Sequence, residues 1–315
     1  MFKKILSLIL TVIFVLSVFS GCSLSSAEDD GRITVVTTIF PAYDFVKQIA
    51  GDKVDVVMLL PPGVESHAYE PAPSDIIAIE NADLFFYVSE HTETWVEQII
   101  SSLKNNNVEI VSVADGTGIE VHGHNHDHHD HHDHEDSDEC ETDEHIWTNL
   151  EYSAAMIDFI AVKLSEKDPD NEAFYESNAE KYKSEILSLK ADFETMIENS
   201  KRKEIVSGSR FAMKNFTNEF GLTFTAAFDS CVDNTEPSAA VMAKIIDKIN
   251  EDDIPVIFYE ELTEPKIARA VSLETGVRML LLHSCHNVSS EELENGETYL
   301  SLMQKNYYNL KEALN

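Results

Sequence analysis

Two regions of the chain alternate short apolar runs with longer amphipathic stretches. In the first region, the β-branched run at 32–38 predicts a buried strand. Further strands are predicted at 54–60, 83–88 and 108–113, and helices at 41–51, 76–81 and 94–103. Strands that alternate with helices at this spacing predict a parallel sheet covered by helices on both faces.

The same alternation returns in the last third of the chain, after a long helical stretch at 150–199. Strands are predicted at 204–207, 222–227, 255–259 and 277–282, and helices at 211–220, 238–250, 265–275 and 299–314. Pro169 interrupts the helical stretch, and Asp168 or Asp170 can cap a new helix there. The segment 172–198 then reads as one long amphipathic helix. Its inward face is predicted to carry Phe174, Tyr182, Ile186, Leu189, Phe193, Met196 and Ile197.

These patterns predict an α/β fold of two (β/α) lobes, each with a central parallel sheet, joined by a long rigid helix. Open α/β sheets bind ligands beyond the carboxyl ends of their strands, so a site is expected in the cleft between the lobes. The predicted parts are a signal peptide at 1–21, a flexible tether at 22–31, an N-terminal lobe at 32–148 that includes a disordered His/Asp-rich loop at 120–143, a helical connector at 149–200 and a C-terminal lobe at 201–315.

The N-terminus has the features of a bacterial export signal. Lys3 and Lys4 precede the apolar run 5–19, and small residues lead directly to Cys22. A cysteine at this place resembles the lipoprotein signal, in which it becomes the lipidated first residue of the mature chain. The alternative is ordinary secretion with cleavage nearby. We therefore expect an extracytoplasmic protein that is anchored to the bacterial cell membrane through Cys22.

An internal segment, HGHNHDHHDHHDH, has histidine at eight of its thirteen positions. It has almost no apolar area to bury, so a mobile loop that collects metal ions is expected, although a merely solvated polar loop is the alternative. The histidines of this accessory metal loop are His122, His124, His126, His128, His129, His131, His132 and His134.

Charge and cysteine content narrow the possible partners. The chain has 23 basic and 57 acidic residues, a net charge of −34, which argues against binding to nucleic acid. Besides Cys22, the chain contains Cys140, Cys231 and Cys285. In an oxidising compartment Cys231 and Cys285 could form a disulfide, and Cys140 could add a soft ligand to the His loop. The sequence leaves the connectivity open.

Three isolated histidines follow predicted strands or stand at the mouth of a connecting loop. These are His67, His145 and His283, and His91 and His286 are competing candidates. Because the carboxyl ends of parallel strands meet at one edge of a sheet, such side chains can converge on a ligand in the cleft.

Several segments resemble the zinc and manganese solute-binding lipoproteins of bacterial ABC transporters. These are PPGVESHAYEPAPSDI, the internal His-rich loop, EHIW, and FYEELTEPKIARAVSLETGVRML, so the resemblance runs from about Thr34 to the C-terminus. It implies the two-lobe fold with one linking helix, with His67 and His145 as the first two metal ligands.

Two family positions differ in this chain. Gly208, in SGSRFAMKNF, stands where the family carries a His or Glu ligand, and His283 appears where the family has an Asp after the last strand. Glu260, in FYEE, resembles an acidic residue that the family keeps near the site, and its alternative role is to cap a helix. The ligand set implied by the resemblance is therefore His67, His145 and His283, completed by water or by Glu260.

Three imidazoles with at most one carboxylate favour tetrahedral Zn²⁺ over Mn²⁺ as the transported ligand. We therefore expect a monomeric zinc-binding protein, not an enzyme, that delivers zinc to an ABC transporter permease and its ATPase. A surface adhesin or a passive zinc store is an alternative. A zinc hydrolase is another, although the sequence lacks HExxH, a Ser-His-Asp signature and a Gly-rich phosphate loop.

Overall fold

The computed structural model describes residues 31–66, 69–104, 107–121, 143–228 and 238–315. Residues 33–315 form one compact unit. No helix within the described ranges is both long and apolar enough to cross a membrane. The signal peptide with Cys22 and the accessory metal loop lie outside the described residues.

The first sheet has four parallel strands in the order β2-β1-β3-β4. Its central strands are almost fully buried, as expected when helices cover both faces. The strands are β1 (Ile33–Thr37), β2 (Val54–Met58), β3 (Leu84–Tyr87) and β4 (Glu109–Ser112). The helices of this lobe are α2 (Phe40–Ala50), α3 (Pro73–Glu80), α4 (Val96–Ser102) and α5 (Val113–Thr117).

The second sheet repeats this topology, with the strand order β6-β5-β7-β8 and parallel pairing throughout. Its strands are β5 (Glu204–Ser207), β6 (Thr223–Ala226), β7 (Val256–Tyr259) and β8 (Arg278–Leu281). The helices are α8 (Lys214–Phe220), α9 (Ala239–Glu251) and α10 (Lys266–Thr275), followed by α11 (Ser290–Glu294) and α12 (Tyr299–Leu314). The predicted α/β fold with two parallel sheets is thus confirmed.

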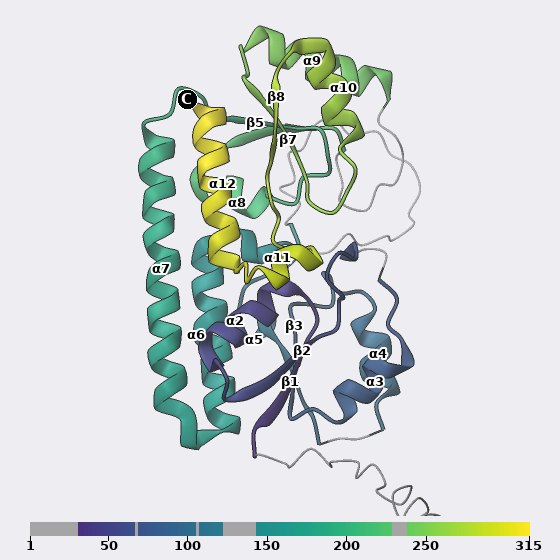
Figure 1. The fold of residues 1–315 in the computed structure, drawn as a ribbon, viewed down its shortest axis with the longest axis vertical. Coiled ribbons are helices and arrows are strands. Elements are labelled where there is room, and N and C mark those ends of the chain that lie inside the picture. Colours follow the sequence, from purple (N-terminus) through teal and green to yellow (C-terminus); the bar gives the residue numbers. More distant parts are fainter. Residues whose placement is uncertain (1–30, 67–68, 105–106, 122–142, 229–237) are drawn as a thin grey trace, which may run out of the picture. The chain divides into compact units, whose positions relative to one another are not determined.

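Two long helices connect the sheets. These are α6 (Leu150–Lys167) and α7 (Glu172–Glu198), separated by a 3₁₀ turn at Pro169–Asn171. Helix α7 packs against α6, α2, α12 and α8, and Figure 1 shows it running beside α6 and α12. One hydrophobic cluster contains residues of both sheets and of α7. The predicted long linking helix is confirmed, and it is packed along its whole length.

Some details of the predicted helices are wrong. Asp168 is the N-cap residue of the 3₁₀ turn and Asn171 is that of α7, but neither side chain makes a capping bond. Asp168 accepts hydrogen bonds from Asn171 Nδ2 and Tyr175 Oη at 2.7 and 2.5 Å. Phe174 is 39% exposed, and Tyr175 takes the buried position. Helix α8 begins at Lys214, three residues later than expected. Phe211 lies before the helix, and its ring stacks on that of Phe224.

Candidate metal centre

His145 lies directly before the 3₁₀ turn Ile146–Thr148 that leads into α6, and its side chain is buried. His145 Nδ1 is 2.6 Å from Asp143 Oδ1. A carboxylate only accepts, so Nδ1 carries the proton, and in the neutral ring Nε2 then holds the lone pair. A metal-bound histidine usually donates its other ring N–H to such a carboxylate, which fixes the tautomer. The pair therefore presents His145 Nε2 as a potential metal ligand.

Asp143 is itself held by several donors. Its Oδ1 also accepts from the backbone N–H of His145 at 3.2 Å, and its Oδ2 accepts from the N–H of Lys214, at the start of α8, at 3.1 Å. Burial opposes the charged form, but the neighbouring His145 and these hydrogen bonds keep the pKa of Asp143 below its usual value. The carboxylate thus stays charged and joins the turn before α6 to the second lobe.

His286, in the loop after β8, packs its ring against that of His145. The ring centroids are 5.2 Å apart and the planes are inclined by 79°. Two imidazoles bound through Nε2 to one tetrahedral zinc, with Zn–N of about 2.0–2.1 Å, would have their ring centres about 5 Å apart. His286 Nδ1 lies 3.1 Å from Ser66 Oγ. The ring nitrogen considered as a metal ligand is therefore Nε2. The spacing of the two rings therefore fits a shared metal ion.

Trp147 contacts both of these histidines. Its ring centroid is 5.3 Å from that of His145 and 4.9 Å from that of His286, with edge-to-face geometry in both cases. Its Nε1 donates to the carbonyl of Ser284 at 2.8 Å, and Tyr299 Oη donates to the Trp147 carbonyl at 2.6 Å. The indole thus fixes the loop after β8 against the turn that carries His145.

The loop after β8 also contacts the loop after β2, in which His67 lies. Gly63 N donates to the Val288 carbonyl at 2.7 Å, and Asn287 Nδ2 donates to the carbonyls of Pro61 and Val64, both at 2.8 Å. His67 itself is outside the described residues. Its neighbour Ser66 contacts His286, with Ser66 Oγ 3.1 Å from His286 Nδ1.

His283, in contrast, belongs to a different network. Its Nδ1 accepts the backbone N–H of Cys285 at 2.9 Å, and its backbone N–H and carbonyl both bond the Asn306 side chain at 2.8 Å. Burial lowers its pKa, but Glu261, 3.6 Å from Nδ1, together with Cys285 and Glu292, raises the pKa well above the usual value. His283 Nε2 lies 3.6 Å from Glu292 Oε1. These contacts place the His283 ring between two carboxylates of its own lobe, Glu261 and Glu292.

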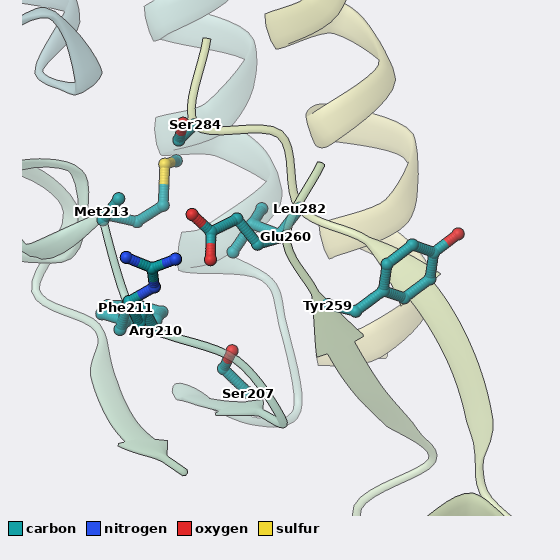
Figure 2. Close-up of a pocket in the computed structure, with 9 residues that line it drawn as sticks. Ser207, Arg210, Phe211, Met213, Tyr259, Glu260, Leu282 and Ser284 are labelled. Atoms are coloured by element: carbon teal, nitrogen blue, oxygen red, sulfur yellow. The ribbon is translucent and has the colours of Figure 1, made fainter. Parts of the chain in front are cut away.

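Glu260 lines a small cavity of about 10 Å³ at the end of β7, together with Arg210, Met213 and Ser284. Figure 2 shows the Arg210 guanidinium directed toward the Glu260 carboxylate. Burial, with the charge of Glu261, raises the pKa of Glu260 to about 7, while Arg210 and His145 act in the opposite direction. Glu260 is thus electrostatically coupled to His145, and its predicted role as a ligand stays a prediction.

Gly208, at the family ligand position, cannot gain a side chain without a shift of the backbone. A Cβ added there would lie 2.6 Å from the backbone N and 2.7 Å from the Cα of Ala268 in α10. Its N–H donates to the Phe258 carbonyl at 2.9 Å, which holds the segment close to β7. The loop after β5 therefore offers no ligand at this position.

The remaining candidates are not brought to this centre by the described contacts. Cys285 is buried, and Cys231 lies outside the described residues, so their disulfide stays a prediction. His91, a competing candidate, is exposed. In the described part of the chain, no group of three or more His, Cys, Asp and Glu side chains is arranged to hold a metal ion. Sequence reasoning did not identify Asp143, although it lies two residues before His145 in DEH.

Comparison with known proteins identifies the family of this chain. The model of the family described as the periplasmic component A of the zinc-uptake complex matches residues 35–313. The chain belongs to this family. The family consists of zinc-uptake components rather than enzymes, which confirms that prediction and leaves the hydrolase alternative unsupported.

Individual relatives cover nearly the whole chain. The high-affinity zinc uptake system protein ZnuA of Bacillus subtilis is 34% identical over 318 residues, covering 100% of this chain and 99% of that protein. The zinc-binding lipoprotein AdcA of Streptococcus pneumoniae is 30% identical over 293 residues, covering 93% of this chain and 58% of AdcA.

Solved structures share the fold. The Zn(II)-bound ZnuA-like domain of Streptococcus pneumoniae AdcA has a TM-score of 0.73 at 30% identity, covering 90% of this chain and 99% of that domain. The metal-dependent lipoprotein YcdH from Bacillus subtilis has a TM-score of 0.75 at 31% identity, again covering 90% of this chain and 99% of its own. These proteins support the same two-lobe arrangement for this family member.

Proposed function

We propose that the protein captures Zn²⁺ outside the cytoplasm and delivers it to an ABC transporter permease with its ATPase. The proposed ligands are His67, His145 and His286, with Glu260 as the carboxylate. His286 replaces His283 in the set expected from the sequence. The observation that carries the proposal is the pairing of His145 with His286 at a ring spacing that suits one tetrahedral zinc.

The chemistry of the donors supports zinc over manganese. Neutral imidazole nitrogens suit Zn²⁺, whereas Mn²⁺ prefers sites that are rich in oxygen ligands. Asp143 behind His145 and Ser66 beside His286 provide the outer contacts that orient metal-bound imidazoles. The names of the relatives, which include a zinc uptake protein and a Zn(II)-bound domain, support the same ion.

A zinc titration with a competing chelator tests the site. The protein would span residues 23–315 with residues 122–134 removed, so that the His loop does not contribute. We expect one tight site that is lost in His67→Ala, His145→Ala and His286→Ala. His283→Gln is the matched control, because it changes a neighbouring histidine of the same loop, and it is expected to keep the tight site.

Two results would contradict the proposed site. Tight binding that disappears when only residues 122–134 are removed would make the His loop the main site, as expected for a passive zinc store. Loss of binding in His283→Gln with retention in His286→Ala would restore the ligand set expected from the sequence. In both cases the melting temperature of the zinc-free variants must show that they are folded.

Delivery to a permease and attachment to the membrane need a cellular test. In a bacterial strain that lacks its own zinc-binding protein of this family, the wild-type chain with its cognate permease and ATPase is expected to restore growth at low zinc. The His145→Ala variant is expected not to do so. The Cys22→Ala variant is expected to leave the membrane fraction, because a single lipid anchor through Cys22 is proposed. Growth restored equally by His145→Ala would contradict the proposed role in uptake.

A further inference from the structure

Arg210, in the loop after β5, lies between carboxylates from both lobes. Its Nη1 is 3.6 Å from Oε1 of Glu65, which stands two residues before His67 in the loop after β2. Its guanidinium is directed toward Glu260 at the end of β7 and lines the same small cavity (Figure 2). The Arg210 side chain is only 15% exposed, so solvent screens these interactions less than at an open surface.

This arrangement places a permanent positive charge beside the carboxylate that is proposed to bind zinc. An arginine side chain stays charged at any physiological pH, and its planar fork can engage two carboxylates. The Arg210 guanidinium is directed toward Glu260 and pairs with Glu65, so its positive charge attracts both carboxylates when zinc is absent.

The same loop provides no ligand that could offset this charge. Gly208 has no room for a side chain against Ala268, and the amide of Glu260 donates to Ser209 Oγ at 3.3 Å. The charged group that this loop contributes near Glu260 is thus the guanidinium of Arg210. A metal site normally has electron-donating ligands at such a position. A divalent ion that approaches Glu260 meets a carboxylate that already has a positively charged partner.

We propose that Arg210 sets the affinity and release rate of the zinc site, because its guanidinium pairs with Glu65 and is directed toward Glu260, so that zinc must compete with its charge at Glu260. This inference rests on the proposed function. It makes Arg210 an affinity-determining residue that weakens capture in exchange for faster release. Arginine competes with zinc for Glu260 through charge alone and takes no part in coordination.

Zinc affinity and release rate measured on Arg210→Gln test the proposal. The protein would be residues 23–315 without residues 122–134, with a chelator as competitor and stopped-flow mixing for release. We expect the Kd for zinc to fall about tenfold, which corresponds to about 1.4 kcal/mol, with a matching decrease of the release rate. Arg210→Lys keeps the charge but loses the fork, so its Kd should lie between those of the wild type and Arg210→Gln.

Two controls separate the mechanism from general effects. Arg269→Gln removes an equal charge from the same lobe, where Arg269 pairs with Glu264 at the exposed surface, and it should leave the Kd unchanged. In a Glu260→Gln background, Arg210→Gln should improve the Kd by less than about threefold, because the competition is for the Glu260 carboxylate.

The outcomes distinguish this inference from the proposed function. An unchanged or higher Kd in Arg210→Gln would overturn the role of Arg210. This holds also if the variant has a lower melting temperature, because a loss of stability without a gain in affinity shows only a structural role. A tenfold gain that persists in the Glu260→Gln background would also overturn it. If instead His145→Ala still binds zinc tightly, the proposed site itself is wrong, whatever Arg210→Gln does.

Discussion

Replacement of Asp143 by Asn tests whether the carboxylate behind His145 prepares the site for zinc. Three N–H groups point at the two oxygens of Asp143: the His145 ring and backbone at Oδ1, and the Lys214 backbone at Oδ2. An asparagine has a single oxygen, so it cannot accept all three. If the asparagine oxygen faces His145, its NH₂ group faces the Lys214 N–H, which is then left without an acceptor. With its oxygen toward Lys214, the NH₂ group forces His145 Nδ1 to accept, which moves the ring proton to Nε2 and removes the lone pair for zinc.

The expected size follows from these two orientations. One unsatisfied buried donor costs about 1–3 kcal/mol, so the zinc-free Asp143→Asn protein should unfold at a lower temperature. Loss of an outer-shell carboxylate typically weakens metal affinity about 10–100-fold, and we expect the Kd for zinc to rise within that range.

A competition titration and a thermal melt of the zinc-free protein measure the two effects separately. The matched control is Asp158→Asn, because Asp158 pairs with Lys183 on the surface of α6 and carries the same charge. This control should change the Kd by less than about twofold, since exposed ion pairs contribute little. If Asp143→Asn binds zinc as tightly as Asp158→Asn does, the idea that Asp143 fixes the His145 tautomer is refuted.

Three further predictions concern the surroundings of the site. Trp147→Phe removes the donor to the Ser284 carbonyl and is expected to weaken zinc binding about tenfold, measured by the same titration; an unchanged Kd would show that the loop after β8 is held without it. Gly208→Ala forces a Cβ against Ala268 and is expected to destabilise the protein by about 1–3 kcal/mol in urea unfolding, and full stability would mean that α10 moves without cost. Burial raises the pKa of Glu93 to about 7, above its value in the unfolded chain, so this group makes the folded state less stable as pH rises from about 4.5 to about 7. Unfolding measured across that range should show this loss in the wild type but not in Glu93→Gln, and parallel pH profiles would contradict it.

The two parallel α/β sheets and the long linking helix could be predicted because they depend on regular hydrophobic spacing. In α7 the buried residues follow alternating steps of three and four, which is the period of one helix face. Tyr175 continues these steps from Tyr182, whereas Phe174 lies one position away and points to the exposed side. The residues predicted for the inward face include Phe174 and not Tyr175. Spacing, rather than side-chain polarity, decides which one is buried.

The site was harder to predict because loops have no such period. His283 and His286 lie three residues apart in the loop after β8, and the sequence allows either of them to be the metal ligand. Between them, Cys285 has a left-handed backbone with a φ of 61°. This turn leaves His283 among the carboxylates of its own lobe and brings His286 to His145. A non-glycine residue in that conformation depends on tertiary contacts, which no single sequence pattern indicates.

Gly208 illustrates the opposite case. The resemblance implies that the family's His or Glu ligand is missing at this position, and the packing against Ala268 gives the physical reason why no larger side chain fits. The presence of Arg210 two residues later was visible in the sequence as well. The structure was needed to show that Arg210 pairs with Glu65 and is directed toward Glu260, because these two carboxylates belong to different lobes.

The most direct test of the central claim is anomalous diffraction at the zinc edge from crystals of the zinc-bound protein without residues 122–134. We expect one strong peak between the lobes, about 2.0–2.1 Å from Nε2 of both His145 and His286. A peak bound instead to His283 Nε2 beside Glu292, with none at the paired histidines, would contradict it.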